Sequence, residues 1–298
     1  MAHDHNHEHG HSHAVSAAQA GSRAFIIGII LNMAYVLAET IAGLWTHSLA
    51  LLTDAGHNLS DVASLALSLV AFRLARVKPT QTFTYGYKKS TILAALINAV
   101  ILLVAIGILG YEAILRIKNP HPIEGGTVAW VAGLGIVINA VSAMLFMRDK
   151  HELNARSAYL HLMADALVSA GVVVAGIVII YTHWYWLDTV VSVVVLMVIL
   201  VSTWSVLRDS LRLTLDAVPR NVDVDEVMQA MREVPYVKAI DHVHIWAMST
   251  TENALTAHIT LTDAGANQFK VIAAIRHELK HHNVQHATIE VDKAVVAG

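Results

Sequence analysis

The sequence predicts an α-helical membrane protein with six transmembrane helices, followed by a small α+β domain. Of the 298 residues, 55% are hydrophobic and 14% are charged, whereas soluble domains usually carry about 25% charged residues. Six apolar segments occupy the first part of the chain, and an ordinary soluble pattern follows them. We therefore expect a disordered histidine-rich segment over residues 1–22, a transmembrane domain over 23–213 and a C-terminal domain over 214–298.

Each apolar segment is long enough to cross a bilayer, which requires about 20 residues. Buried helices of a soluble protein are the alternative, but connections as short as Thr46–Ser48 disfavour it. The expected spans are Ala24–Trp45, Leu49–Leu74, Ser90–Ile117, Thr127–Met147, Ala155–Tyr181 and Trp184–Leu207.

Basic residues near the spans predict the orientation, because positively charged loops remain in the cytoplasm. Lysines and arginines gather between the second and third spans, between the fourth and fifth, and after the sixth. The opposite loops carry Arg116 and Lys118 alone. This asymmetry predicts that both termini, and with them the C-terminal domain, are cytoplasmic.

Net charge and cysteine content exclude some classes of function. The net charge of −3 and the isoelectric point near 6.7 give no support for nucleic-acid binding. The chain has no cysteine, so it can form neither disulfide bonds nor thiolate metal sites.

The C-terminal segment has the pattern of a compact α+β domain. Apolar and polar residues alternate from Leu255 to Leu261, as in a strand with one buried face. The expected elements are a helix (Val224–Met231), two strands (Val237–Ala247 and Ala254–Thr262), a helix (Gln268–His281) and a strand (Ala287–Asp292). This order predicts helices on one face of a sheet and a free second face, with neighbouring strands antiparallel.

A histidine and an aspartate lie four residues apart in the second span, and the same spacing recurs in the fifth. The pairs are His57 with Asp61 and His161 with Asp165. Residues four apart share one face of a helix, so two such helices facing each other would bring two imidazoles and two carboxylates together. That ligand set suits Zn²⁺ and similar divalent ions.

The energetic cost of these aspartates favours a metal site over unrelated helix packing. An aspartate at the centre of a span costs roughly 2.5–3.5 kcal/mol, which a cation, a partner or water must offset. Asp54 lies one turn from His57 and Asn58 on the same helix face, and Asp54 and Asn58 are candidates to support the ligands. Asp54 either supports the ligands, lies on an ion path, or pairs with a carboxyl group such as that of Glu39 if one of the two is protonated.

These motifs resemble the cation diffusion facilitator family, and in particular its bacterial zinc-exporter branch. The matching stretches are TDAGHNLSD in the second span, HLMAD in the fifth, YGYKKSTILAALINA at the third and DHVHIWAM in the C-terminal segment. The resemblance covers nearly the whole chain. It implies a homodimeric antiporter in a bacterial inner membrane that exports divalent metal from the cytoplasm in exchange for protons, with a ferredoxin-like cytoplasmic domain.

The resemblance also assigns residues and a metal. His57, Asp61, His161 and Asp165 would form the transport site, with Zn²⁺ as first substrate and Co²⁺, Cd²⁺ or Ni²⁺ as further ones. Histidine and aspartate ligands exchange metal for protons, as alternating access with proton exchange requires. In the cytoplasmic domain, it implies His244, His258, His286 and Asp292 as ligands of a further Zn²⁺, with His242 and Glu290 as additional candidates; solvated surface histidines are the alternative.

Three further features lie outside these two sites. His3, His5, His7, His9, His11 and His13 alternate with polar residues, which suggests a loose metal collector or, alternatively, a dispensable tail. Lys89 and Asp216 match positions where the family places a charge pair. Glu112 and Asp188 lie near span ends, where water solvates carboxylates, so we expect no role for them.

Two other functions would use the same residues. An intramembrane metalloenzyme needs an open metal position and a neighbouring base, and the sequence contains no HExxH or other recognised hydrolase motif. A membrane metal sensor would need an output module, which the sequence does not show. We therefore expect a transporter and not an enzyme, and metal flux distinguishes the three.

Overall fold

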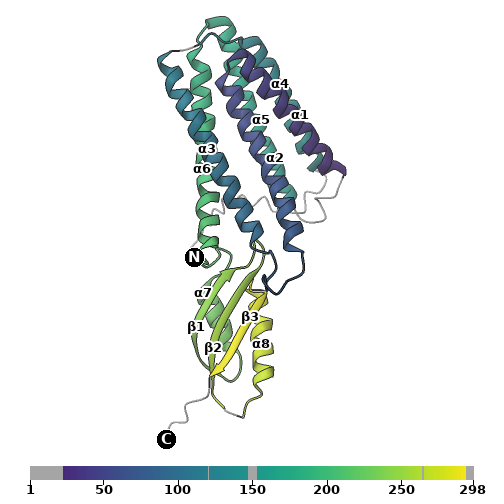
Figure 1. Ribbon diagram of the computed structural model, residues 1–298, viewed down its shortest axis with the longest axis vertical. Coiled ribbons are helices and arrows are strands. Elements are labelled where there is room, and N and C mark those ends of the chain that lie inside the picture. The colour runs from purple at the N-terminus through teal and green to yellow at the C-terminus, as the bar shows by residue number, and fades with distance from the viewer. Residues whose placement is uncertain (1–22, 120, 147–152, 264, 293–298) are drawn as a thin grey trace, which may run out of the picture. The chain divides into compact units, whose positions relative to one another are not determined.

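The computed structural model describes residues 23–119, 121–146, 153–263 and 265–292. Six long helices come first, and a helix, two strands, a helix and a strand follow (Figure 1). The long helices are α1 (Arg23–Thr46), α2 (Leu49–Ala75), α3 (Ser90–Lys118), α4 (Gly125–Phe146), α5 (Leu153–Thr182) and α6 (Trp186–Thr214). One compact unit contains the described residues up to Val70 and from Ile97 to Leu207, and a second contains Ala71–Leu96 and the described residues from Arg208 onward.

The helices of the first unit have the length and apolar composition of membrane spans. Five qualify among the described residues, namely α2 to α6, and α1 has a shorter apolar stretch, Ile30–Thr46. Apolar side chains such as Ile108, Trp130 and Val201 point outward from this unit, which water would not tolerate over so many turns. The chain is therefore an integral membrane protein with a helical transmembrane domain, as predicted.

Helices α4 and α5 approach each other closely where two glycines face one another. A Cβ atom on Gly125 would lie 2.5 Å from the carbonyl oxygen of Gly176, and one on Gly176 would lie 2.9 Å from the nitrogen of Ala129. Small residues allow such backbone contact between spans. This contact holds α5, which carries one of the two His/Asp pairs, against α4.

Asp188, at the start of α6, fixes the N-terminal end of α2. It was expected to be solvated and without a role, but it is 1% exposed. Its carboxylate accepts hydrogen bonds from the Ser48 hydroxyl at 2.5 Å and from the backbone nitrogens of Leu49 at 2.7 Å and Ala50 at 3.3 Å. The first N–H groups of a helix have no partner within the helix and carry partial positive charge. Asp188 therefore caps α2, the helix that carries the other His/Asp pair.

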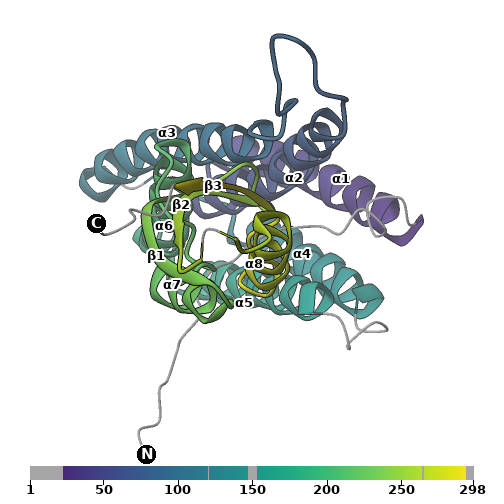
Figure 2. The same ribbon diagram turned by 90° about the horizontal axis from the view of Figure 1, so that it is seen from below.

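The second unit contains a two-layer α+β domain. Its elements are α7 (Val224–Glu233), β1 (Val237–Ala247), β2 (Asn253–Leu261), α8 (Gln268–His281) and β3 (His286–Asp292). The strands form one sheet in the order β1-β2-β3, and α7 and α8 cover one of its faces (Figure 2). Residues of both helices and of all three strands form one apolar core.

The pairing of the strands corrects one expectation. β1 and β2 are antiparallel, but β2 and β3 are parallel. The reason is the connection, because α8 carries the chain back along the sheet before β3 begins, as in any βαβ unit. Leu255, Ala257 and Ile259 face the helices and are buried, whereas His258 points to the uncovered face and is partly exposed.

Replacing Asp188 with alanine is expected to destabilise the transmembrane unit by about 1–3 kcal/mol, because it leaves buried N–H and hydroxyl donors at the start of α2 without an acceptor. The thermal unfolding midpoint of the detergent-solubilised protein measures this loss. Glu112→Ala is the control, since the Glu112 side chain is 41% exposed and pairs with Arg116 on its own helix. An unchanged midpoint for Asp188→Ala would show that the cap does not stabilise α2.

Candidate metal centre

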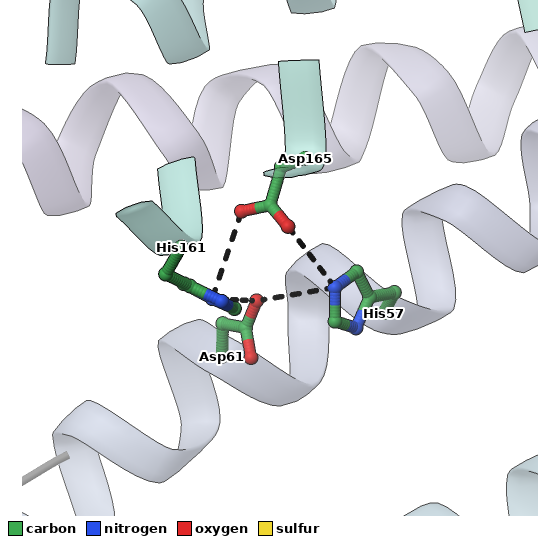
Figure 3. A group of neighbouring side chains, drawn as sticks. All are labelled: His57, Asp61, His161 and Asp165. Atoms are coloured by element: carbon green, nitrogen blue, oxygen red, sulfur yellow. Dashed lines mark hydrogen bonds and ion pairs between the residues drawn. The ribbon is translucent and has the colours of Figure 1, made fainter. Parts of the chain in front are cut away.

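The two His/Asp pairs of α2 and α5 converge inside the first unit. His57 and Asp61 project from α2, His161 and Asp165 project from α5, and the four side chains point toward one another (Figure 3). His57 Nε2 lies 3.2 Å from Asp165 Oδ1 and 3.8 Å from Asp61 Oδ2. His161 Nε2 lies 3.0 Å from Asp61 Oδ2 and 3.6 Å from Asp165 Oδ2. Each imidazole nitrogen therefore lies between two carboxylates, in a ring of alternating imidazole and carboxylate groups that we call the quartet.

The spacing of the donor atoms fits a tetrahedral metal ion. All four ligand atoms lie within 4.8 Å of one another. Zinc bonds to histidine and aspartate measure about 2.0–2.2 Å, which places tetrahedral ligand atoms about 3.3–3.6 Å apart. The nitrogen–oxygen distances of 3.0 to 3.8 Å in the quartet bracket this range. An ion could therefore enter with small movements of the side chains.

Access to the quartet differs between its two sides. The side chain of Asp61, on the side toward the C-terminal end of α2, is 27% exposed, and that of Asp165 is 5% exposed. One turn nearer the N-terminal end of α2, Thr53 and Asp54 are fully buried. The quartet is therefore more exposed toward the predicted cytoplasmic ends of the helices than on the other side, which we call the closed side.

A second polar layer lies against the closed side of the quartet. Asp54 accepts a hydrogen bond from Ser169 of α5 at 3.2 Å, and Asn58 donates to Glu39 of α1 at 3.4 Å. Glu39 also accepts from the hydroxyl of Tyr35 at 2.9 Å. Of the alternatives for Asp54, the arrangement favours a pairing with Glu39, since both carboxyl groups are fully buried in this layer and interact electrostatically. The sequence named Glu39 only as a partner of Asp54, although a glutamate inside an apolar span is itself a signal.

A smaller group of side chains that could bind a metal ion lies on the uncovered face of the sheet in the second unit. His258 Nε2 is 3.7 Å from Glu290 Oε2, and His258 Nδ1 is 3.4 Å from Asp292 Oδ1. The parallel register places Glu290 directly opposite His258. These three side chains are between 36% and 69% exposed, so they form a more open site than the quartet.

The other predicted histidine ligands of this domain lie outside this group. The ring of His242 is tilted beside that of His258, with ring centroids 5.2 Å apart, at a β-bulge that breaks the alternation between Asp241 and His244. His286 packs edge-on against Tyr85, with ring centroids 5.6 Å apart. Neither His244 nor His286 joins the His258 group among the described residues. His258, Asp292 and Glu290 are among the candidate ligands predicted from the sequence, and in the described part of the chain the structure brings these three together without His244 and His286.

The loop between α2 and α3 forms two ion pairs within the second unit. Lys89 Nζ lies 2.6 Å from Asp216 Oδ1, the pair that the sequence suggested. Lys88 Nζ lies 2.5 Å from Glu252 Oε2, a contact that no sequence pattern indicated. The six histidines between His3 and His13 lie outside the described residues.

Comparison with known proteins gives matches along almost the whole chain. Residues 25–214 match the family described as the cation efflux transmembrane domain, and residues 219–294 match the ZT_dimer family, described as the cytoplasmic domain of cation efflux proteins. A Bacillus subtilis protein named cadmium, cobalt and zinc/H(+)-K(+) antiporter is 35% identical over 98% of this chain and 92% of its own length.

Two further relatives cover similar lengths. The zinc transporter ZitB of Escherichia coli is 35% identical over 98% of this chain and 93% of its own length. The metal cation efflux system protein CzcD of Cupriavidus metallidurans is 37% identical over 91% of this chain and 87% of its own length.

Replacing His57 with alanine is expected to weaken Zn²⁺ binding at the quartet by about 100-fold or more, because even groups that only support a metal ligand contribute about 10–100-fold. Isothermal titration calorimetry of the detergent-solubilised protein should then show one fewer high-affinity site. Glu124→Gln is the control, since Glu124 is exposed and hydrogen-bonds Thr127 of its own turn. If His258→Ala removed that site and His57→Ala did not, the quartet would not be the high-affinity centre.

Proposed function

Because the chain belongs to the cation efflux family, the cation diffusion facilitator family of membrane metal transporters, we propose that it exports Zn²⁺ from the cytoplasm in exchange for protons. The observation that carries this proposal is the quartet, in which His57, Asp61, His161 and Asp165 lie at tetrahedral ligand spacing between two spans. The export direction and the proton coupling follow the names and domains of the relatives.

The quartet suits exchange better than permanent binding. Imidazole binds metal only in its neutral form, so a proton and a metal ion compete for the same nitrogen. Without metal, each histidine can hold its two neighbouring carboxylates through a charge-assisted hydrogen bond. The quartet is therefore stabilised either by a bound metal ion or by protons on its histidines. Protons that arrive from outside can take the place of the departing metal.

The donor set and the relatives support the same substrates. Two nitrogen and two oxygen ligands suit Zn²⁺, and they bind Co²⁺, Cd²⁺ or Ni²⁺ with little discrimination. The relatives are named for zinc, for cadmium, cobalt and zinc, or for metal cations in general. We propose Zn²⁺ as the first substrate, with the other three ions as further ones.

The coordination of the quartet favours transport over the two alternatives. A catalytic zinc site keeps one position open for water or substrate, whereas here four protein ligands surround the ion position. A sensor would need to hold its ion while it signals from a second module. The His258, Glu290 and Asp292 group is a better candidate for sensing, and we propose that it binds a regulatory Zn²⁺, with His242, His244 and His286 remaining predicted ligands.

Several features of the intact protein belong to the same proposal. The ZT_dimer match over residues 219–294 supports a homodimer. The bacterial relatives support an inner-membrane protein, and the basic loops support cytoplasmic termini. The histidines from His3 to His13 would then collect metal on the side toward which the quartet is more exposed, and the Lys89–Asp216 pair would tie the loop after α2 to the segment after α6.

Sealed proteoliposomes with an acidic lumen test the exchange. The native chain should take up Zn²⁺, reported by a lumenal zinc dye, while a pH dye reports protons leaving the lumen. Asp165→Ala should abolish both signals, because it removes one ligand and one partner of each histidine. Since one relative is named for potassium as well, the assay is run with and without K⁺.

The control variant is again Glu124→Gln, which should transport like the native chain. Metal uptake by Asp165→Ala at the native rate would show that the quartet is structural. An absence of flux for every divalent metal in the native chain would favour the enzyme or the sensor.

A further inference from the structure

Two buried carboxyl groups outside the quartet share a polar cluster that the proposed transport mechanism does not use. Glu39 of α1 and Asp54 of α2 are both 0% exposed, and they lie in one polar layer, where Asn58 donates to Glu39 and Ser169 donates to Asp54. Two carboxyl groups buried together cannot both be ionised at low cost unless a cation accompanies them. We therefore expect the pair to hold one proton when no cation is near.

The surroundings offer no other charge to balance the pair. Helices α1, α2, α4 and α5 contain no lysine or arginine between their end turns. Asp54 Oδ1 is buried and has no N–H or hydroxyl donor among the described residues. Two ionised carboxylates in such a place would repel each other without compensation. A shared proton removes that repulsion.

Neutral donors complete the cluster and hold it in place. Tyr35 and Asn58 donate to the two oxygens of Glu39, and Ser169 donates to Asp54. The tyrosine ring lies over Gly135 of α4, where a Cβ atom would collide with it. The cluster thus connects α1, α2, α4 and α5. Its neutral donors can hydrogen-bond to the carboxyl pair whether the pair carries one negative charge or no charge.

The position of the pair couples it to the metal. Asp54 lies one turn from His57 along α2, and Ser169 lies one turn from Asp165 along α5. The titratable groups that face the pair are Tyr35 from α1, His57 from α2 and Asp165 from α5, and α4 has no titratable side chain. A divalent ion in the quartet would add positive charge next to the pair and favour its ionised form.

We propose that Glu39 and Asp54 form a proton-binding site, separate from the metal ligands, that loses its shared proton when metal occupies the quartet and regains it when metal leaves. The site lies on the side of the quartet toward the Thr46–Ser48 connection, which is the predicted outer side. A proton that enters from outside therefore reaches the pair before it reaches the quartet. One proton leaves toward the cytoplasm as metal binds, and one is taken up from outside as metal is released.

The test counts protons released per Zn²⁺ bound, using a pH dye in weakly buffered solution with the full-length detergent-solubilised protein. Glu39→Gln should release about one proton fewer than the native chain, because glutamine hydrogen-bonds to an Asp54 carboxylate that is already ionised. Its Zn²⁺ affinity should stay within about threefold, since all four ligands remain. Asp54→Asn should give the same deficit from the other helix, and it reports on the pair if Glu39→Gln does not fold.

Two controls separate this inference from a merely structural role. Glu112→Gln removes an exposed carboxylate from a span and should release the native number of protons. Glu39→Asp restores a carboxyl group and should recover the native count. A native proton count in both Glu39→Gln and Asp54→Asn would overturn the proposal, as would loss of Zn²⁺ binding in both.

The inference rests on the proposed exchange, and the same data distinguish their failures. If the native chain released no more protons than His57→Ala, the exchange at the quartet itself would fail. If the native chain released more than His57→Ala but no more than Glu39→Gln, the exchange would stand and the carboxyl pair would have no part in it. Protons displaced from other histidines are common to all variants and cancel in the comparison.

Discussion

The charge of two aspartates inside a helical membrane bundle is the constraint on which the rest of the structure depends. Asp61 and Asp165 can lie in the spans only if a cation, a polar partner or water offsets their charge, since a bare carboxylate there is costly. The histidine of the opposite helix lies 3.0 Å from Asp61 and 3.2 Å from Asp165. In the proposed exchange, either a metal ion or protons on the imidazoles supply the positive charge. A bundle that needs a cation but does not fix its identity is suited to exchange one cation for another.

The remaining contacts of the first unit place the quartet on two well-supported helices. Asp188 caps α2 at the closed end, and the Gly125–Gly176 contact holds α5 against α4. Between the cap and the quartet lies the layer that contains Glu39 and Asp54, and both of these side chains are fully buried. Burial therefore increases from Asp61 to Asp54 within about two turns of α2. In the proposed exchange, metal that leaves on the closed side has to pass this polar layer.

Local patterns in the sequence predicted most of the fold and the four residues of the quartet. The i,i+4 spacing put each histidine and its aspartate on one helix face, and the cost of burying Asp61 and Asp165 indicated a cation. The spacing of residues along the sequence could not predict which distant segments contact each other. Asp188 looked solvated because its acceptor role depends on Ser48 and Leu49, which lie far away in the chain. Glu290 lies next to His258 because the connection through α8 makes β3 parallel to β2. His286 packs against Tyr85, which lies in the loop between α2 and α3. In each case a tertiary contact decided what the local pattern left open.

The coordination of bound zinc tests the central claim most directly. Zinc K-edge X-ray absorption of the His258→Ala protein, loaded with less than one equivalent of Zn²⁺, reports the ligands of the tightest remaining site. The account predicts four nitrogen or oxygen ligands at about 2.0 Å, with outer-shell scattering from two imidazoles, and loss of that signal in the His57→Ala, His258→Ala double variant. A spectrum with three or more imidazoles, or one that the His57 substitution leaves unchanged, would contradict it.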